Sequence, residues 1–391
     1  MKILVVTTSF PLKCGDSLSP FLWEFCRRLK ERGWDVTVIV PHHKGVKEED
    51  DWEGIAIKRF RYLPESMENF AYSGGLLPGL KRNPFRIFGV LLFINAMYRK
   101  VIKTIDEGNF DIVNVHWLFP AAFWANRLYR KRSPAIVFTG HGTDVQLTRK
   151  FPFNKFADNA LGAASGLTLN SRYMQRILRG RAVPEKIEII PMGTDTDKFR
   201  PAETKPSKSK KILFIGRLIK QKGVDMLIEA YSLVKKSYPD AELEIIGYGT
   251  EKTRLLGIVK SLGLWQNVTF SDAVEYDKLT EKYRAARILA FPSLIGEGFG
   301  MTVAEAAACG IPTITFGLGG TAELVVDNET GMIVSPNVGS LSEGLKRLYS
   351  DDTLVDDMGE RARKRIEDHY NWEIIGDKFD RFFKDILSRE K

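Results

Sequence analysis

Two glutamates, Glu297 and Glu305, stand eight residues apart on either side of a glycine turn and a helix start. The apolar run Ile288–Phe291 precedes them and Gly310 follows, a pattern that predicts a strand, a Gly-rich loop and a short helix ending at that glycine. The first backbone N–H groups of a helix behind such a loop have no partner within the helix, so they bind anions. Eight helical residues span roughly 12 Å, which lets two carboxylates bind hydroxyl groups on both sides of a diphosphate. A nucleotide sugar has this layout of sugar, diphosphate and ribose.

Two cations, Arg217 and Lys222, come shortly after another predicted strand, Lys211–Ile215, and next to Gly216. Ligands of parallel sheets bind at the carboxyl ends of the strands, so both side chains should lie at the mouth of a crevice. There they could neutralise a diphosphate leaving group, together with the backbone N–H groups near Gly300–Thr302. The alternative is a solvated basic turn. We favour anion binding because the cations occur together with the glutamate loop.

Two of the five histidines, His116 and His141, lie at the ends of predicted strands. His141 is flanked by glycines that let a ligand approach closely, so we predict a functional role for it, and an acceptor-side role for Asp144 in the same loop. For His116, a structural hydrogen bond and an acceptor contact remain alternative interpretations. Gly15, in the loop after the first strand, could bring the backbone close to a substrate.

The composition is that of a soluble globular protein: 391 residues, 44% hydrophobic and 27% charged, which suffices for two domains. The charge is uneven, because residues 1–200 hold 31 Lys and Arg against 20 Asp and Glu, whereas residues 201–391 hold 27 against 29. A basic N-terminal half suggests either an anionic partner or a solvated basic surface without one. The three cysteines show no paired or metal-type spacing, and no apolar run is long enough to span a membrane, so we expect a cytoplasmic protein.

Both halves alternate predicted strands and helices, which is typical of an α/β fold with doubly wound parallel sheets. The polar stretch 201–210 is the expected linker. We therefore expect an N-terminal domain over residues 1–200, a C-terminal domain over residues 201–370, and a last helix, residues 371–391, that packs back on the N-terminal domain. The helical tail should break near Tyr370. The predicted strands are Lys2–Thr7, Asp35–Val40, Ile112–His116, Ala135–Thr139, Gly166–Leu169 and Ile187–Ile190, then Lys211–Ile215, Glu242–Ile246, Val268–Phe270, Ile288–Phe291, Thr313–Phe316 and Met332–Val334; the predicted helices of the first half are Pro20–Arg32, Pro84–Glu107, Ala121–Lys131, Asn154–Ala163 and Ser171–Gly180.

These motifs, taken together and in this order, resemble glycosyltransferase family 4. The resemblance covers nearly the whole chain. It includes the opening strand and loop, the Gly-His-Gly-Thr-Asp segment at Gly140, and the Pro-Met-Gly-Thr-Asp-Thr-Asp hinge at Pro191. It continues with the Gly-Arg-Leu segment at Gly216, the Glu-x7-Glu motif at Glu297 and the Gly-Gly turn at Gly319. The resemblance implies a GT-B fold, in which two Rossmann-like domains face each other across a cleft.

The resemblance also implies a reaction. A hexose would move from a UDP- or GDP-linked sugar to a lipid-linked or saccharide acceptor, with retention at the anomeric carbon and with neither a metal nor another cofactor. Arg217 and Lys222 would hold the diphosphate, Glu305 the ribose and Glu297 the sugar hydroxyls, while His141 would lie near the reaction centre. The catalytic set is thus His141, Glu297, Arg217 and Lys222; the donor-binding set is Gly15, Gly216, Arg217, Lys222, Gly298, Phe299, Gly300, Met301, Thr302 and Glu305; and the acceptor-side set is His116 and Asp144.

Three positions depart from the family pattern. Asp16 follows Gly15 where paired glycines are usual, and Met192 stands in the hinge where Asn is usual. Ser271-Asp272 replaces an apolar residue and a glycine near the strand that would bind the base. The nucleotide base therefore stays open.

Two other functions stay open beside transfer. A sugar-nucleotide epimerase on the same fold would need no acceptor site, and the basic, apolar-rich first half argues against it. A catalytically idle membrane or sugar-nucleotide binding protein need not keep Arg217, Lys222, Glu297 and Glu305 together. A dinucleotide oxidoreductase is disfavoured because neither first turn reads Gly-x-Gly-x-x-Gly, and a nucleic-acid binder because no such motif accompanies the positive charge.

Clustered cations in the first half suggest peripheral binding to the inner face of an anionic membrane. Arg172, Arg176 and Arg179 fall on one face of a predicted helix. The alternative is that the apolar residues are core and the cations merely solvated. The other cations, which bracket the apolar stretch Phe70–Gly79, are Lys58, Arg59, Arg61, Lys81, Arg82 and Arg86.

Overall fold

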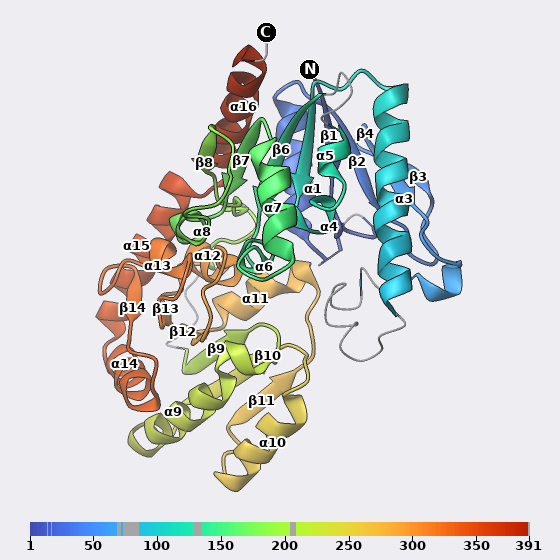
Figure 1. Cartoon of the computed structure of the whole chain (residues 1–391). Coiled ribbons are helices and arrows are strands. Elements are labelled where there is room, and N and C mark those ends of the chain that lie inside the picture. Colours follow the sequence, from blue (N-terminus) through green and yellow to red (C-terminus); the bar gives the residue numbers. More distant parts are fainter. Residues whose placement is uncertain are drawn as a thin grey trace. The chain divides into compact units, whose positions relative to one another are not determined.

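The computed structural model describes residues 1–13, 15–16, 18–68, 72, 86–128, 134–203 and 209–389, without the side chains of Arg86 and Asn126. It divides into two compact units. Unit 1 comprises Met1–Pro191 and Ile375–Lys391, and unit 2 comprises Met192–Ile374. Each unit is built on one largely parallel β-sheet with helices packed against it (Figure 1).

The sheet of unit 1 has eight strands in the order β3-β4-β2-β1-β5-β6-β7-β8. Every pairing is parallel except that of β3 with β4. The strand order reverses between β1 and β5, which is the topological switch point where open α/β sheets bind ligands. The strands are β1 (Lys2–Val6), β2 (Asp35–Pro41), β3 (Glu49–Trp52), β4 (Ile55–Phe60), β5 (Ile112–His116), β6 (Ala135–Gly140), β7 (Gly166–Leu169) and β8 (Ile187–Ile189).

The central strands of unit 1 are buried along their length, as apolar, β-branched runs between two helical layers should be.

None of the helices described in either unit has both the length and the apolar character that crossing a bilayer requires. The helices of unit 1 are α1 (Pro20–Glu31), η1 (Glu65–Met67), α3 (Arg86–Glu107), α4 (Leu118–Ala121), α5 (Ala125–Leu128), α6 (Thr143–Leu147), α7 (Phe153–Gly162) and α8 (Arg172–Ile177), joined by most of α16 (Trp372–Arg389).

The antiparallel hairpin of β3 and β4 is absent from the sequence-based prediction. Its first strand, Glu49–Trp52, is acidic and has low β-propensity. The signal that was missed is the turn: Glu53 and Gly54 both have positive φ, 53° and 76°, and together they join the paired residues Trp52 and Ile55. Two positive-φ residues between paired strands are the pattern of a tight hairpin turn.

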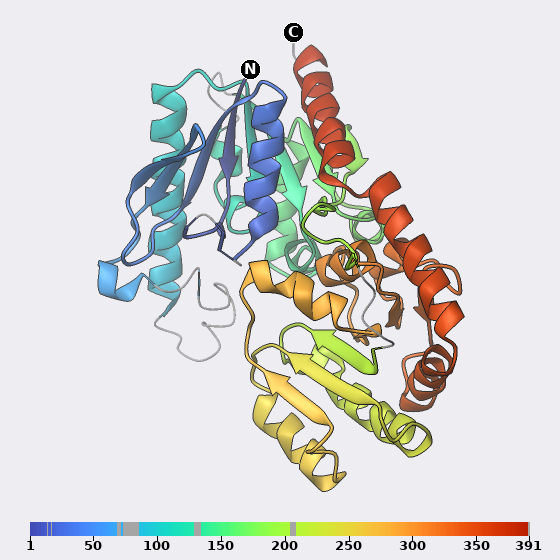
Figure 2. The ribbon, with the colours of Figure 1, turned by 180° about the vertical axis from the view of Figure 1, so that it is seen from behind.

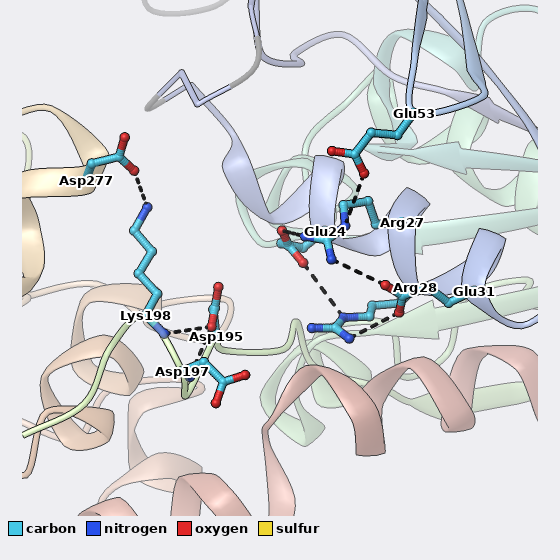
Figure 3. A network of polar contacts seen from close by, with 9 residues as sticks. All are labelled: Glu24, Arg27, Arg28, Glu31, Glu53, Asp195, Asp197, Lys198 and Asp277. Atoms are coloured by element: carbon cyan, nitrogen blue, oxygen red, sulfur yellow. Dashed lines mark hydrogen bonds and ion pairs between the residues drawn. The ribbon is translucent and has the colours of Figure 1, made fainter.

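An ion-pair network covers the exposed side of α1 (Figure 3). The guanidinium of Arg27 lies 3.0 Å from Glu24 and 3.3 Å from Glu31, one helical turn away on either side. A third carboxylate, that of Glu53 in the hairpin turn, lies 3.7 Å away. Part of the positive charge of unit 1 is therefore neutralised within the unit, although exposed pairs of this kind each stabilise by only about 0.2–1 kcal/mol.

The predicted break in the C-terminal tail is confirmed, because α15 (Asp352–His369) ends just before Tyr370 and α16 begins at Trp372. From Ile375 onward α16 belongs to unit 1 (Figure 2). The Phe379 ring lies 4.8 Å from that of Phe25 in α1, and Trp34 donates its indole N–H to Asp380 at 2.8 Å. Aromatic burial and this hydrogen bond hold the last helix against α1 and the residue that precedes β2.

Unit 2 has a six-stranded parallel sheet in the order β11-β10-β9-β12-β13-β14, with its switch point between β9 and β12. The strands are β9 (Lys211–Ile215), β10 (Glu242–Ile246), β11 (Val268–Ser271), β12 (Ile288–Phe291), β13 (Thr313–Thr315) and β14 (Gly331–Ile333). The helices are η2 (Lys220–Lys222), α9 (Val224–Ser237), α10 (Lys252–Ser261), η3 (Tyr276–Lys278), α11 (Leu279–Arg284), α12 (Met301–Ala308), α13 (Thr321–Leu324), α14 (Val338–Ser350) and α15.

The two chain segments that connect the units lie side by side within unit 2. Thr194 donates its N–H to the carbonyl of Tyr370 at 2.8 Å, and a side chain at Gly193 would come within 2.4 Å of the Trp372 ring. The Asp195 carboxylate accepts two backbone N–H groups from its own turn, including that of Lys198 at 2.9 Å (Figure 3). Asp195 thus orders the hinge, as its place in the sequence indicates.

Candidate functional site

The loops that follow β9 and β12 are held together at the switch point of unit 2. Leu294 donates its N–H to the carbonyl of Gln221 at 2.8 Å. Gly223 has a φ of 64°, and a Cβ there would lie 2.2 Å from the carbonyl oxygen of Pro292. Only glycine fits this approach of two backbones. The residues of both loops are therefore placed relative to each other by main-chain contacts.

Lys222 and Glu297 form an ion pair across these loops. The Nζ atom of Lys222 lies 2.6 Å from Oε1 of Glu297, and the side chains are only 12% and 17% exposed. Ser293 donates its hydroxyl to the same carboxylate oxygen, and the ammonium lies 5.1 Å from the centroid of the Phe291 ring. Partial burial strengthens such a pair.

Arg217 leaves the same strand end as Lys222, and its side chain is exposed. The turn that carries it is tight, because Gly216 donates its N–H to Ile246 at 3.0 Å and a Cβ on Gly247 would lie 1.9 Å from the carbonyl oxygen of Gly216. The structure therefore brings the two predicted cations to one strand end, one paired and shielded and the other in solvent.

The α12 helix begins directly behind the Glu297 loop. Gly300 precedes it with a φ of 110°, which turns the chain so that the helix starts at Met301. The Gly319–Gly320 turn supports this loop: Gly320 donates its N–H to the carbonyl of Glu297 at 2.8 Å, and a Cβ there would lie 2.4 Å from Gly298. The Gly319–Gly320 turn therefore holds the loop that carries Glu297 in place by main-chain contacts.

Glu305 lies one turn into α12 and is only 7% exposed. Tyr283 of α11 donates its hydroxyl to Oε2 of Glu305 at 2.7 Å, which leaves Oε1 for another donor. Burial raises the pKa of Glu305 to about 7, against the smaller opposing effects of the Tyr283 hydroxyl and the Lys198 charge. Lys198 itself bonds to Asp277 at 2.6 Å (Figure 3). Sequence analysis missed Tyr283, because no short-range pattern links α11 to α12.

Two histidines and an asparagine meet at the carboxyl ends of three neighbouring strands in unit 1. His116 ends β5, His141 follows β6 and Asn170 follows β7. The Nδ1 atom of His116 lies 2.9 Å from Nε2 of His141, and the amide of Asn170 lies 3.3 Å from Nδ1 of His141. Sequence analysis missed Asn170, although its position directly after the strand Gly166–Leu169 was a usable signal.

Both imidazoles are kept neutral. Burial lowers the pKa of His116 well below its usual value, and the neighbouring His141 lowers it further. Burial also lowers the pKa of His141, with Asp144 acting in the opposite direction. The Nε2 atom of fully buried His116 has no hydrogen-bond partner, so a hydrogen on Nδ1, donated to His141, avoids a buried unpaired donor. His141 then carries its own hydrogen on Nδ1, facing the Asn170 amide oxygen in one of its two orientations.

The Asp144 carboxylate holds the two histidine loops together. It accepts backbone N–H groups from Leu118 at 3.0 Å, His141 at 3.1 Å and Gly142 at 2.8 Å, and the residue is 4% exposed. A carboxylate with three backbone donors is well satisfied. Asp144 therefore fixes His141 relative to the first turn of α4.

Gly15 lies in the loop after β1 with a φ of 79°, a conformation that favours glycine. The neighbouring Asp16, which departs from the family pattern, accepts the N–H groups of Leu12 at 3.0 Å and Leu18 at 3.2 Å. Asp16 therefore stabilises this loop by hydrogen bonds to the backbone on both of its sides.

The cations expected at a membrane surface differ in their environments. Arg59 is only 1% exposed and donates to the carbonyl of Lys47, so the expectation that it is a surface cation is wrong. Arg61 is paired with Glu48 at 2.5 Å. The three arginines on and after α8 are exposed. Lys81, Arg82, the side chain of Arg86, and the stretch Phe70–Gly79 apart from Tyr72 lie outside the described residues.

Comparison with known proteins matches this architecture. The chain fits the family described as Glycosyl transferases group 1 over residues 195–365 and Glycosyltransferase Family 4 over residues 19–198. It is 31% identical to the GDP-mannose-dependent monoacylated alpha-(1-6)-phosphatidylinositol monomannoside mannosyltransferase of Corynebacterium glutamicum, over 71% of this chain and 77% of the relative. It is 26% identical to the GDP-mannose-dependent alpha-(1-6)-phosphatidylinositol monomannoside mannosyltransferase of Mycolicibacterium smegmatis, over 96% of both.

Solved structures show the same fold. Sucrose-phosphate synthase from Thermosynechococcus elongatus superposes with a TM-score of 0.81 at 19% identity, covering all of both chains. HepE from Anabaena, solved with UDP and glucose, gives a TM-score of 0.74 at 18% identity, over 98% of this chain and 100% of the other. Two α/β units of this kind define a glycosyltransferase of the GT-B type. The chain belongs to glycosyltransferase family 4.

Proposed function

We propose that this glycosyltransferase moves a hexose from a nucleotide-diphosphate sugar to a lipid-linked acceptor, with retention at the anomeric carbon and without a metal. The observation that carries the proposal is the Lys222–Glu297 ion pair at the β9/β12 switch point, with the N-terminus of α12 directly behind it. GDP-mannose is the first donor to test, because relatives that span nearly the whole chain are named as GDP-mannose-dependent. A UDP-linked hexose is the second.

In this proposal the donor opens the ion pair. The diphosphate takes the ammonium of Lys222 and the guanidinium of Arg217, and the freed Glu297 carboxylate accepts sugar hydroxyls. Glu305 holds the ribose with Oε1 while Tyr283 occupies Oε2. Charge grows on the diphosphate as the glycosidic bond breaks, so the cations and the first N–H groups of α12 bind the transition state more strongly than the ground state.

The acceptor in this proposal meets the neutral histidines of unit 1. His141 is half-buried and has its ring held by His116, Asn170 and the backbone bonds of Asp144. Attack from the face of the leaving group gives retention. The departing diphosphate can accept the acceptor's proton there, so the pair of carboxylates that a glycosidase needs is not required.

Peripheral membrane binding is part of the proposal, and α3 supports it. Four large apolar residues are exposed in the first two turns of this helix, Ile87 at 45%, Phe88 at 66%, Leu91 at 56% and Leu92 at 49%. Leu92 lines a surface depression together with Arg99, Lys100 and Lys103 of the same helix, and exposed apolar side chains near basic ones suit an anionic bilayer surface. We expect Leu91→Ser/Leu92→Ser to lower co-sedimentation with anionic vesicles, whereas Leu256→Ser, an exposed leucine of α10, should not. Absence of wild-type binding to anionic vesicles at low salt would leave a soluble saccharide acceptor.

A donor screen tests the function as a whole. Full-length protein is incubated with GDP-mannose, GDP-glucose, UDP-glucose and UDP-N-acetylglucosamine, with and without phosphatidylinositol-based acceptors. The expected result is transfer from one donor that depends on the acceptor and is lost in Lys222→Ala. Conversion of the sugar nucleotide to its epimer without an acceptor would establish the epimerase instead. Tight donor binding with no turnover on any acceptor would favour an idle binding protein.

A further inference from the structure

An aromatic patch lies on unit 1 outside the residues discussed so far. Ring contacts join four phenylalanines, from α4, the segment between α4 and α5, and α7: Phe119, Phe123, Phe153 and Phe156. Phe151, two residues before Phe153 in the segment between α6 and α7, is counted with them as the fifth member of the patch. Ring centroids of Phe119 and Phe153 lie 5.1 Å apart, and those of Phe123 and Phe156 lie 4.6 Å apart. Phe151 is 74% exposed and Phe156 is 37% exposed. Apolar rings gathered at a surface mark a binding site more often than isolated ones do.

The aromatic patch adjoins the histidine site. Its first member, Phe119, is two residues from Trp117, whose ring centroid lies 4.6 Å from that of His141. The intervening Leu118 donates its N–H to Asp144, which also bonds to the backbone of His141. The α4 and α6 helices, which follow the carboxyl ends of β5 and β6, are in contact (Figure 1). The patch and the histidines thus belong to the same unit and to neighbouring segments of it.

The charge around the aromatic patch is positive. Residues 148–157 include Arg149, Lys150 and Lys155 and no acidic residue, and all three cations are exposed. The ammonium of Lys155 lies 5.6 Å from the centroid of the Phe151 ring. Exposed rings with cations beside them are complementary to a molecule that joins a hydrocarbon chain to an anionic phosphate.

We propose that the aromatic patch binds the hydrocarbon chain of the acceptor while its three cations bind the acceptor's phosphate. This inference rests on the proposed lipid-linked acceptor and states how that acceptor is held. A chain seated on Phe151 and Phe156, with its phosphate at Arg149 and Lys150, directs the sugar-bearing end toward His141. The patch is distinct from the exposed turns of α3, to which the membrane contact was assigned.

Binding of a single-chain amphiphile tests the patch without any need for turnover. Isothermal titration calorimetry on the full-length protein uses dodecyl phosphate below its micelle concentration, with dodecyl maltoside and inorganic phosphate as comparison ligands. The expected result is saturable binding that is strongest for dodecyl phosphate and weakens about tenfold in Phe151→Ser/Phe156→Ser, equivalent to about 1.4 kcal/mol. The α3 variant Leu91→Ser/Leu92→Ser is the matched control and should change the Kd less than twofold. Absence of saturable binding, or equal weakening in both variants, would overturn the proposal.

Two further readouts separate the possible failures. Phe151→Ser/Phe156→Ser should lower kcat/KM for a long-chain acceptor but leave it unchanged for a deacylated acceptor with the same headgroup. A patch variant that loses vesicle binding but keeps its affinity for dodecyl phosphate would show a membrane-docking surface and overturn the acceptor assignment. Wild-type protein that binds dodecyl phosphate but transfers no sugar would contradict the proposed function and leave the binding site standing.

Discussion

The two switch points of this protein carry different chemistry, although each lies between two parallel strands where the strand order reverses. In unit 2 the loops that follow the neighbouring strands β9 and β12 carry a charged pair, Lys222 and Glu297. Arg217, in the loop after β9, is exposed to solvent. In unit 1 the switch point lies between β1 and β5, and β5 ends at His116, whose neutral ring contacts the neutral ring of His141. Both sites lie where parallel strands end, so the fold supplies the position in each case and the loops supply the chemistry.

The difference matches the two partners of the proposed reaction. A diphosphate leaves as an anion and needs cations that strengthen their hold as charge develops. An acceptor hydroxyl is neutral until it reacts, so the site that receives it needs no charge of its own. Burial produces opposite pKa shifts as well, because it raises the pKa of the Glu305 carboxyl in unit 2 and lowers those of the histidines in unit 1.

The largest effect is expected from Lys222→Ala. The variant removes a cation whose interaction with the diphosphate grows in the transition state, so kcat should fall roughly 10²–10³-fold with a smaller change in the donor KM. Steady-state kinetics with saturating acceptor measure this, and Lys220→Ala, an exposed lysine in the same turn, is the control. An unchanged kcat would show that Lys222 does not stabilise the leaving diphosphate, and the contrast between the two switch points would then fail.

A smaller effect, on binding rather than on the chemical step, is expected from Glu305→Ala. In the proposed function it removes one hydrogen bond to the ribose that is present in ground and transition states alike, so the donor KM should rise roughly ten- to hundredfold with little change in kcat. Tyr283→Phe, which removes only the donor to Oε2, should shift the KM less. If Glu305→Ala leaves the donor KM unchanged, the ribose assignment is wrong.

The opposite pKa shifts predict opposite dependences of stability on pH. Glu305 has its pKa raised from 4.5 to about 7, so the folded protein binds more protons than the unfolded chain in this range. Its contribution to the free energy of unfolding should therefore decrease as the pH rises from 4.5 to 7, by on the order of 3 kcal/mol. His116 has a lowered pKa, so its contribution is present above the usual histidine pKa and lost as the pH falls below it.

Urea unfolding of the wild type and of two non-titrating variants measures these slopes between pH 4.5 and 7.5. Relative to Glu305→Gln, the wild type should lose stability as the pH rises. Relative to His116→Gln, it should gain stability over the acidic part of the same range. If the free energy of unfolding changed with pH in the same direction relative to both variants, burial would not shift the pKa values of Glu305 and His116 in opposite directions.

No effect is expected from chelation. In the proposed function the charge of the diphosphate is met by Arg217, Lys222 and the N-terminus of α12, so transfer should continue in excess EDTA. The measurement compares initial rates with and without chelator and after readdition of Mg²⁺ or Mn²⁺. Complete loss of activity on chelation, restored by either ion, would mean that protein cations alone do not neutralise the leaving group.

Much of the fold could be predicted from the sequence because the relevant signals are local. Every strand predicted from an apolar run is present within two residues of its expected bounds, for example Ile288–Phe291 as β12. The acidic strand Glu49–Trp52 escaped prediction because its pairing with β4, and not its own propensity, makes it a strand. The helix α7 begins at Phe153, in agreement with the predicted Asn154 start.

The candidate residues were selected from local signals in the sequence, whereas their contacts could not be predicted from it. Strand ends followed by glycines pointed to Arg217, Lys222 and His141, because turns at these positions leave a recognisable composition. Nothing local pointed to Tyr283, which donates to Glu305 from another helix. The position of Asn170 directly after a predicted strand was a local signal that went unused, but its contact with His141 was not predictable from it. Arg59 shows the same limit, because a basic residue in a sequence looks like a surface cation until the packing around it is known.

The sequence by itself determined the family, the alternation of strands and helices, and the eight-residue spacing that sets Glu297 before α12 and Glu305 within it. Only the tertiary structure decided that Lys222 meets Glu297, that His116 meets His141, and that Tyr283 meets Glu305. The physical reason is that helix pitch and strand periodicity act between near neighbours, whereas burial, pairing and pKa depend on which distant segments exclude water from each other.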